Sequence, residues 1–476
     1  MKNSWTLLVA VVGLTLLIEN PVSAQGQIKG LFGFPCPSNC PDGWSPDGGL
    51  TQASDGNFYG TASQGGNGSQ SQARGTIFRI SPSGEFKLLF TFTADGNGDF
   101  SNGSQPFAGL VEGIDGALYG TTATGGANDA GVVFKISKAG TFKVLHHFCS
   151  EAGCADGSTP FAPLALGNDG KLYGTASAGG SSSAGTIFRI TDAGAFTVLH
   201  TLNGSSDGSE PMGGLMQASD GNFYGGTNTG TNNLAANLVR ITPGGDFAVV
   251  APLPFLGNIQ GQLVQGANGK LYGNIQYDAL FDVSAPDGVQ LLLSLDSQQD
   301  GDSPLAAGLI QGSDGNLWGT SAGEGFGNYG VIYAITPDGS FVKNFAFNCS
   351  NGGGGESAAI QGSDGKLYGT TAGCGTDSKG QRAFGAVYSL DAGLNPPLAG
   401  IAAMNPKTGS VGTKVVLRGE HFIGTTGVSF NGSAAKFRVV NTTFVVAEVP
   451  LGATTGPISV TNPGGITKSR QVFTVK

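Results

Sequence analysis

The chain has 476 residues, of which 83 are glycine, and only 12% of its residues are charged. This composition, with no long amphipathic pattern, excludes a helical bundle and favours many short strands joined by glycine-rich turns. The net charge of −9, without a run of Lys or Arg, argues against a nucleic acid partner, because affinity for phosphates comes mostly from basic side chains.

The first residues have the pattern of a secretory signal peptide. Lys2 precedes an uncharged apolar run from Thr6 to Ile18, and Val22-Ser23-Ala24 supplies the small residues of a cleavage site. The apolar run is about 13 residues, short of the roughly 20 that span a bilayer. We therefore predict a signal peptide at residues 1–24, a secreted or envelope-associated protein, and no transmembrane segment in the mature chain.

One motif recurs seven times, and its most regular form is Asp-Gly-x-(Phe/Leu)-Tyr-Gly-Thr. The copies start at Asp55, Asp115, Asp169, Asp220, Asn268, Asp314 and Asp364. Each copy lies in a longer unit of four apolar runs, which in the first unit cover residues 49–52, 57–61, 75–80 and 86–90. We name these strands A to D. Four short strands per roughly 50 residues, repeated seven times, predict the blades of a seven-bladed β-propeller.

The seventh unit lacks its last strand, because after residues 385–390 the chain continues into Asn395-Pro396-Pro397. The missing strand has a counterpart near the N-terminus, where residues 28–34 align with residues 86–92. We therefore predict that residues 27–34 complete the last blade and close the ring, which removes exposed strand edges.

The repeat resembles a known family. Residues 109–148, which read Gly-Leu, Asp-Gly-x-Leu-Tyr-Gly-Thr-Thr, Gly-Gly and Gly-x-Val-Phe-Lys-Ile, resemble the GloVer tandem-repeat family of exported bacterial proteins. The resemblance covers about residues 27–393. The repeats are more distantly similar to the propellers of two-component sensor proteins. Neither resemblance implies catalysis by the repeated residues.

The composition changes after Pro397 to alternating Val and Thr strands with their own turns. Residues 406–422 look like the opening of an IPT/TIG domain, and residues 427–432 and 456–465 fit the same pattern. This resemblance implies an immunoglobulin-like β-sandwich. We thus expect an all-β protein with a propeller at residues 25–395 and the sandwich at 396–476. DNA-binding relatives of this module carry basic loops; here we expect no basic patch, and a spacer or adhesion role.

Six cysteines fall in the loops that connect strands B to C and D to A: Cys36, Cys40, Cys149, Cys154, Cys349 and Cys374. An even number in an exported protein indicates disulfides. The loop positions favour the pairs 36 with 40, 149 with 154 and 349 with 374, although the sequence alone allows 15 connectivities. No histidine pattern supports a metal site.

The connections of a blade divide between the two faces of a propeller. The A–B and C–D turns, which are short and uniform here, form one face, the turn face. The longer and more variable B–C and D–A loops form the other, the loop face, and function is usually placed in such loops. The irregular residues of the loop face are our candidates for ligand contacts: Trp44, Phe100, Glu324, Phe326, Tyr329 and Arg382.

Repetition gives the other candidate features a structural interpretation. The aromatic residue of each motif is expected to pack between blades. Five glutamines on the innermost strands, with Glu112 in blade 2 and Leu166 in blade 3, are expected to form a hydrogen-bonded ring. Asp-Gly-Ser sequences in the D–A loops indicate turns. Asp95 to Asp99 has the alternating oxygen ligands of a calcium loop but no downstream bidentate Glu, so we expect no cofactor and retain calcium as the alternative.

The sequence contains no motif for nucleophilic catalysis, and we predict no catalytic residues. We interpret the chain as a monomeric binding scaffold that takes a glycan or a protein on its loop face. The alternative is a secreted polysaccharide lyase or glycosidase, which requires a carboxylate pair or an Arg, His and Tyr cluster near the channel.

Overall fold

The computed structural model describes residues 26–36, 40–66, 73–229, 236–253, 259, 261–275, 279–284, 288–294, 308–321, 329–355, 357–377 and 380–476. The regular secondary structure of these residues consists of β-strands and one turn of 3-10 helix, η1 (Ala152–Cys154). The predicted signal peptide at 1–24 lies outside the described residues. Within them, no helix is long and apolar enough to cross a membrane.

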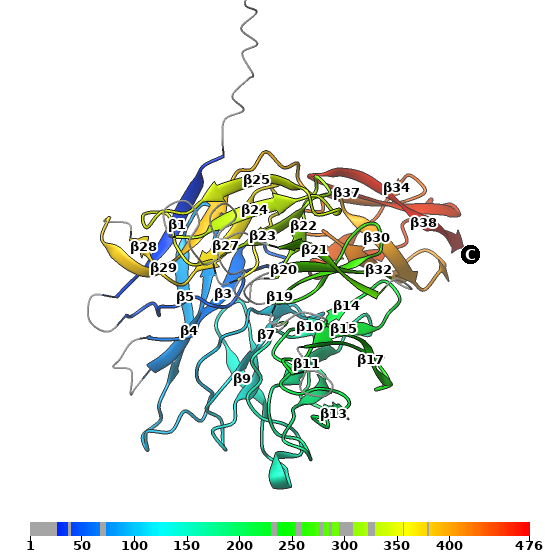
Figure 1. Cartoon of the computed structure of the whole chain (residues 1–476). Coiled ribbons are helices and arrows are strands. Elements are labelled where there is room, and N and C mark those ends of the chain that lie inside the picture. Colours follow the sequence, from blue (N-terminus) through cyan, green and yellow to red (C-terminus); the bar gives the residue numbers. More distant parts are fainter. Residues whose placement is uncertain are drawn as a thin grey trace, which may run out of the picture.

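Six antiparallel sheets of four strands follow one another along the chain (Figure 1). Blades 1 to 3 contain β2 (Thr51–Gln52), β3 (Phe58–Ala62), β4 (Ala73–Ile80), β5 (Phe86–Thr93); β6 (Val111–Glu112), β7 (Leu118–Thr122), β8 (Val132–Ile136), β9 (Phe142–His147); and β10 (Ala165–Leu166), β11 (Leu172–Ala176), β12 (Thr186–Ile190), β13 (Phe196–Thr201). Blades 4 to 6 contain β14 (Met216–Gln217), β15 (Phe223–Gly226), β16 (Asn237–Ile241), β17 (Phe247–Pro252); β18 (Val264–Gln265), β19 (Leu271–Ile275), β20 (Ala279–Ser284), β21 (Gly288–Ser294); and β22 (Ile310–Gln311), β23 (Leu317–Thr320), β24 (Val331–Ile335), β25 (Phe341–Ala346).

The N-terminal strand completes blade 7, as predicted. This blade joins β26 (Ile360–Gln361), β27 (Leu367–Thr371), β28 (Gly375–Thr376) and β29 (Arg382–Leu390) to β1 (Ile28–Pro35). Strand β1 pairs antiparallel with β29, with Ile28 opposite Leu390 and Gly30 opposite Tyr388. Phe34 is fully buried, with its ring 5.3 Å from that of Phe78 in blade 1. The chain therefore closes the ring with its own beginning.

The repeated motif builds the turn between strands A and B of each blade. In blade 1 the Gly56 amide donates to the Ala53 carbonyl, and Gly56 takes a φ of 82°, which favours glycine. The Tyr59 hydroxyl donates to the Asp55 carboxylate at 2.8 Å. The same tyrosine to aspartate bond recurs in blades 2, 3, 4 and 7, at Tyr119, Tyr173, Tyr224 and Tyr368.

The motif aromatics pack between neighbouring blades, which confirms their structural interpretation. The Tyr173 ring lies 4.0 Å from that of Phe223 in blade 4, and the Tyr368 ring 4.1 Å from that of Phe58 in blade 1. Burial, together with the hydrogen bond to Asp169, raises the pKa of Tyr173 to about 12. These tyrosines are therefore neutral packing residues at any physiological pH.

The C-terminal residues form an immunoglobulin-like sandwich, which confirms the predicted fold class. One sheet has the order β30-β32-β36-β35 and the other β31-β38-β37-β33-β34. The strands are β30 (Gly400–Asn405), β31 (Thr408–Gly409), β32 (Lys414–Glu420), β33 (Gly427–Phe430), β34 (Ser433–Ala434), β35 (Phe437–Val439), β36 (Phe444–Glu448), β37 (Gly456–Asn462) and β38 (Gly465–Val475). Val415, Leu417, Val445 and Phe473 are fully buried in its core.

The C-terminal domain lies against the turn face of the propeller. The buried Asn441 side chain donates to the Glu112 carbonyl of blade 2 at 2.9 Å. In the linker, the Asn395 carbonyl accepts hydrogen bonds from Ser313 of blade 6 and Gln361 of blade 7. The domain therefore packs over the turn face, and its expected spacer or adhesion role stays a prediction.

Candidate functional site

The glutamines of the innermost strands form a ring of blade-to-blade hydrogen bonds on the turn face, as predicted. Each side-chain oxygen accepts from a backbone amide in the A–B turn of the preceding blade. The pairs are Gln52 with Ser363, Gln217 with Asn168, Gln265 with Ser219, Gln311 with Ala267, and Gln361 with Ser313, at 2.8 to 2.9 Å. These side chains therefore hold the ring together.

Glu112 occupies the glutamine position in blade 2 and makes the same link, because its carboxylate accepts from the Ser54 amide at 2.7 Å. It is 3% exposed and pairs with the Lys138 ammonium at 2.5 Å. Burial raises the pKa of Glu112 above its ordinary value, although the bonds from Lys138 and Ser54 oppose this. Leu166 of blade 3 cannot accept a hydrogen bond, so one junction lacks the link.

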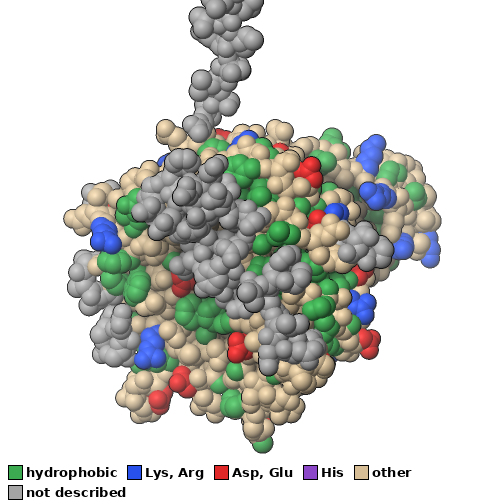
Figure 2. All heavy atoms as spheres, viewed as in Figure 1, with side chains coloured by type: hydrophobic (Ala, Val, Ile, Leu, Met, Phe, Trp, Pro, Cys, Tyr) green, Lys and Arg blue, Asp and Glu red, His purple; other side chains and the backbone are tan. Residues whose placement is uncertain are grey.

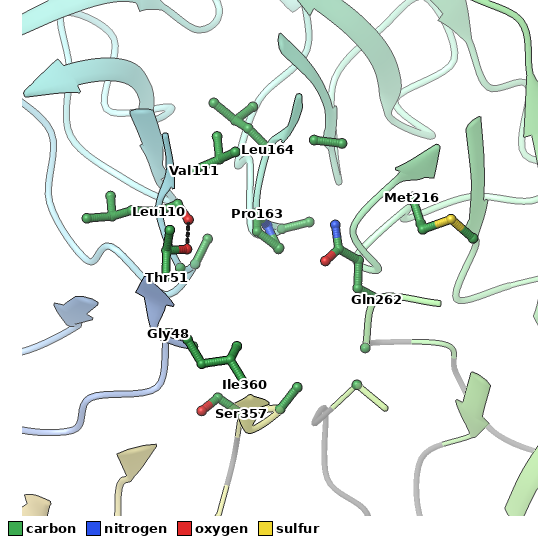
Figure 3. A pocket seen from close by; sticks show the side chains of 18 of the residues that line it. Gly48, Thr51, Leu110, Val111, Pro163, Leu164, Met216, Gln262, Ser357 and Ile360 are labelled. Atoms are coloured by element: carbon green, nitrogen blue, oxygen red, sulfur yellow. Dashed lines mark hydrogen bonds between the residues drawn. The ribbon is translucent and has the colours of Figure 1, made fainter. Parts of the chain in front are cut away.

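A central cavity of about 540 Å³ runs between the innermost strands of all seven blades (Figure 3). The residue two positions before the start of each innermost strand is small in six blades, and the set is Gly49, Gly109, Pro163, Gly214, Gln262, Gly308 and Ala358. Gln262 is the exception: its amide donates to the Leu215 carbonyl at 2.7 Å, and its oxygen faces the open centre (Figure 3). Residues 441–443 of the C-terminal domain line the cavity at the turn face.

The cavity lining bears on the enzyme alternative. Among the described residues that line it, Glu112 carries the only carboxylate, and that carboxylate is engaged by Lys138 and Ser54. The other lining side chains in this part of the chain are apolar, amide or hydroxyl groups. The described lining therefore does not pair two carboxylates.

The loop face has a repeated framework that joins each D–A loop to the next B–C loop. Isolated backbone bridges connect Trp44 with Gln64, Ser104 with Thr124, Ser158 with Ala178, Ser209 with Thr229, and Gly353 with Cys374. The aspartates of two D–A loops hold histidines of strand D: His146 with Asp156 and His200 with Asp207, both at 3.0 Å. The Asp-Gly-Ser sequences are therefore structural, as predicted.

One position of this framework carries side chains of very different size. It is the residue two places before the regular part of strand C. Its backbone carbonyl accepts a hydrogen bond from a backbone amide of the next D–A loop, and this bond is present at Arg74, Ala130, Ala184 and Phe384. Blades 2 and 3 have buried Ala130 and Ala184, whereas blades 6, 7 and 1 have Tyr329, Phe384 and Arg74, which are exposed. The counterpart in blade 5, Tyr277, lies outside the described residues. The consecutive blades 6, 7 and 1 thus present large side chains on the loop face.

One of these side chains, Phe384, forms a cluster with two neighbours across the junction of blades 7 and 1. The Trp44 and Phe384 rings meet edge to face at 6.3 Å, and the Arg382 guanidinium lies 5.5 Å from the Phe384 ring centre. Phe384 is 37% exposed. We call Trp44, Arg382 and Phe384 the aromatic cluster.

The other predicted contact residues lie in other loops of the loop face or outside the described residues. Phe100 is nearly buried, and the Arg74 guanidinium lies 4.7 Å from its ring centre, so Arg74 is the exposed member of that pair. Tyr329 is 38% exposed and accepts the Gly354 amide on its carbonyl. Glu324 and Phe326 fall outside the described residues.

Sequence reasoning missed Phe384 and Arg74. The signal was present, because aligning the blades on the glycine that opens strand C puts Arg74, Tyr329 and Phe384 in one column with Ala130 and Ala184. What the alignment does not show is that the large side chains in this column are exposed to solvent.

Two of the three expected disulfides are present. Cys36 is bonded to Cys40 and Cys149 to Cys154. Cys349 and Cys374 are free thiols that contact each other, and burial with this contact raises the pKa of Cys374 to about 12. A disulfide between them stays a prediction.

The calcium alternative also stays a prediction. In the Asp95 to Asp99 loop, the Asp95 carboxylate accepts the amides of Asn97 and Asp99 at 2.9 and 3.1 Å. Among the described residues, no group of three or more His, Cys, Asp or Glu side chains is placed to hold a metal ion.

Comparison with protein families matches residues 46–282 to the Gloeobacter/Verrucomicrobia repeat and residues 400–475 to the IPT/TIG domain. No curated protein matches the chain. Solved structures with similar folds include a fungal alcohol oxidase of the AA5 family in complex with copper (12% identity, 91% of this chain, 97% of that chain, TM-score 0.47). They also include a putative 6-phosphogluconolactonase from Bacteroides uniformis (15% identity, 63% of this chain, 83% of that chain, TM-score 0.42). A second one, from Bacteroides fragilis, matches similarly (15% identity, 70% of this chain, 92% of that chain, TM-score 0.42). Similarity at this level carries no argument about activity.

Proposed function

Because this chain belongs to the Gloeobacter/Verrucomicrobia repeat family and ends in an IPT/TIG domain, we propose that it is an exported binding protein that holds a glycan on its loop face. The repeat and the IPT/TIG domain together indicate a binding or scaffold role. The exported location is supported by the two disulfides within single loops, because disulfides persist in oxidising compartments.

One observation carries the proposal: large exposed side chains on the loop face occupy the same position in the consecutive blades 6, 7 and 1, where blades 2 and 3 have buried alanine. A substitution that only maintained the fold would have no reason to expose an aromatic ring. Exposed aromatic residues on a rigid framework are typical of recognition surfaces.

The aromatic cluster has the chemistry for a sugar ligand. The Trp44 and Phe384 rings offer apolar faces to the C–H side of a pyranose ring, and the Arg382 guanidinium donates hydrogen bonds to hydroxyl or carboxylate oxygens. Small-ligand sites usually combine apolar surface with a few polar groups.

Binding of an oligosaccharide panel tests the proposal, and intrinsic fluorescence reports on it directly. Trp44 is half-buried on the loop face, whereas Trp318 is fully buried, so a ligand at the cluster changes the Trp44 signal. We expect at least one oligosaccharide to bind, and Trp44→Ala or Phe384→Ala to weaken it about tenfold or more, as expected for central aromatic contacts.

Phe341→Ala is the matched control, because Phe341 is 40% exposed on the outer strand β25. It should leave the affinity unchanged. The proposal fails if no oligosaccharide binds, or if binding survives both cluster substitutions. Capture of a protein alone by the same face would replace the glycan with a protein ligand.

A further inference from the structure

The net charge of −9 is the sum of two domains of opposite charge. Residues 396–476 contain eight Lys or Arg but only Glu420 and Glu448, a net charge of +6, which leaves −15 for residues 1–395. We expected no basic patch because no run of Lys or Arg exists in the sequence. That expectation was wrong, since strands apart in the sequence bring basic residues together. Figure 2 shows Lys and Arg side chains gathered at the end that holds β37 and β38.

Three of these cations line a single cleft between the two domains. The cleft has a volume of about 860 Å³, and its IPT/TIG wall contains Arg418 of β32 with Lys468 and Arg470 of β38. Lys468 and Arg470 are two residues apart on one strand, so their side chains leave the same face of the sheet. The only acidic residue in the lining is Glu420.

The three cations are not neutralised within the described part of the chain. No ion pair there involves Arg418, Lys468 or Arg470. Arg418 is half-buried, and burial lowers the pKa of its guanidinium. A desolvated cation without a partner favours an anion from outside.

The propeller wall of the cleft is neutral, although the propeller as a whole is strongly acidic. It consists of residues from strand A and the A–B turn of blades 3 to 6, with no Asp or Glu. Among them are Asn168, Gln217, Ser219, Gln265 and Gln311. An anion in the cleft would therefore meet cations on one side and amides or hydroxyls on the other.

We propose that this cleft binds an anionic glycan, a polysaccharide that carries carboxylate or sulfate groups. Arginine guanidinium groups pair with such groups through two parallel hydrogen bonds. The lining contains no aromatic side chain, and single-stranded nucleic acid is usually held by stacking on aromatic rings, which favours a glycan. The site lies on the turn face and does not rest on the loop-face proposal.

Binding of the full chain to polygalacturonate and dextran sulfate tests this inference, with neutral dextran as the uncharged polymer. We expect at least one charged polymer to bind and neutral dextran not to bind, and affinity to fall about tenfold or more between roughly 50 and 300 mM salt, as for an interaction between opposite charges. Arg418→Gln and the double variant Lys468→Gln, Arg470→Gln should each weaken binding at least about fivefold.

The matched controls are Lys436→Gln and Lys476→Gln, which remove the same charge from the same domain outside the cleft lining. They should change affinity by less than about twofold if the cleft, rather than overall charge, holds the polymer. Arg418→Lys keeps the charge but not the paired hydrogen bonds, so it should bind more tightly than Arg418→Gln and more weakly than the wild type, which separates the lost charge from a folding defect.

Several outcomes would overturn the inference. They are the absence of binding to both charged polymers at low salt, an equal loss in the control variants, or tighter binding of a single-stranded DNA oligonucleotide than of either glycan. Trp44→Ala should not affect this binding, so failure here and failure of the loop-face proposal are distinguishable.

Discussion

The turn face and the loop face of the propeller are built from the same repeats but use them differently. On the turn face the repeated Gln, Asp and Tyr side chains are engaged in bonds within and between blades, and the C-terminal domain packs over them. On the loop face the backbone framework repeats, while one position changes from buried alanine to exposed Arg74, Tyr329 and Phe384. The difference teaches that repeated residues hold the ring, and that departures from the repeat mark the surface that we propose binds a ligand.

The two faces exist only while the ring of blades is closed. We expect the largest loss of stability from a deletion that opens the ring. Deletion of Ile28–Pro35 removes the outer strand of blade 7 and the buried Phe34. We expect the melting temperature to fall by roughly 10 °C or more. Calorimetry measures this, with Lys29→Ala on the exposed side of the same strand as a control that should hardly change it. An unchanged melt after the deletion would show that β1 does not close the ring.

The turn face should be sensitive at the point where the C-terminal domain docks. Asn441 is buried, donates to the Glu112 carbonyl and accepts from the amides of Thr443 and Phe444. Asn441→Ala leaves these groups without partners, which should cost about 2 to 3 kcal/mol and expose the linker at 391–397 to proteases. Denaturant unfolding and limited proteolysis measure both effects. The exposed Thr474→Ala is the control, and equal behaviour of the two variants would contradict the docking role.

The aspartates of the turn face should make stability depend on pH. Burial raises the pKa of Asp115, but hydrogen bonds from the Lys135 ammonium, the Tyr119 hydroxyl and a backbone amide outweigh this and lower the pKa. Similar bonds lower the pKa values of Asp55, Asp169 and Asp220. A lowered pKa stabilises the fold above the unfolded value of about 3.9, and this contribution is lost as pH falls through the folded value.

We therefore expect unfolding free energy to decline as pH falls below about 5. Asp115→Asn should cost about 1 kcal/mol at pH 7 and progressively less in acid. Unfolding titrations from neutral pH to about pH 2 measure the slope. A variant with the same acid dependence as the wild type would show that this carboxylate contributes nothing to it.

The glutamine ring offers a pair of opposite changes. Gln265→Ala removes the acceptor for the Ser219 amide and the donor to Gly269, and should cost about 1 kcal/mol. Leu166→Gln adds an acceptor at the one junction that lacks it, and should cost less than Gln265→Ala or stabilise the ring slightly. Thermal unfolding of both variants measures the difference. A larger loss from Leu166→Gln would mean that its packing, not the missing bond, matters there.

The smallest effect on stability is expected on the loop face. Phe384→Ala removes a ring that is 37% exposed, so the unfolding free energy should change by less than about 1 kcal/mol. Its effect should appear in ligand affinity instead. A loss of several kcal/mol would make Phe384 a core residue and remove the contrast between the faces.

The sequence alone determined the seven repeats, the closing N-terminal strand and the C-terminal sandwich. Each of these depends on local signals that recur at a fixed spacing, such as the Asp-Gly turn before Phe58-Tyr59 and its six counterparts. The pairing of Cys36 with Cys40 and of Cys149 with Cys154 followed from short loops in the same way.

Only the tertiary structure decided where the C-terminal domain lies and which charges meet. The contact of Asn441 with Glu112 joins residues 329 positions apart, and the cleft joins Arg418 to Lys468 and Arg470 from separate strands. No local pattern encodes such contacts, because they depend on how two folded surfaces fit. The exposure of Phe384 beside Trp44 is of the same kind, since it follows from the closure of the ring between blades 7 and 1.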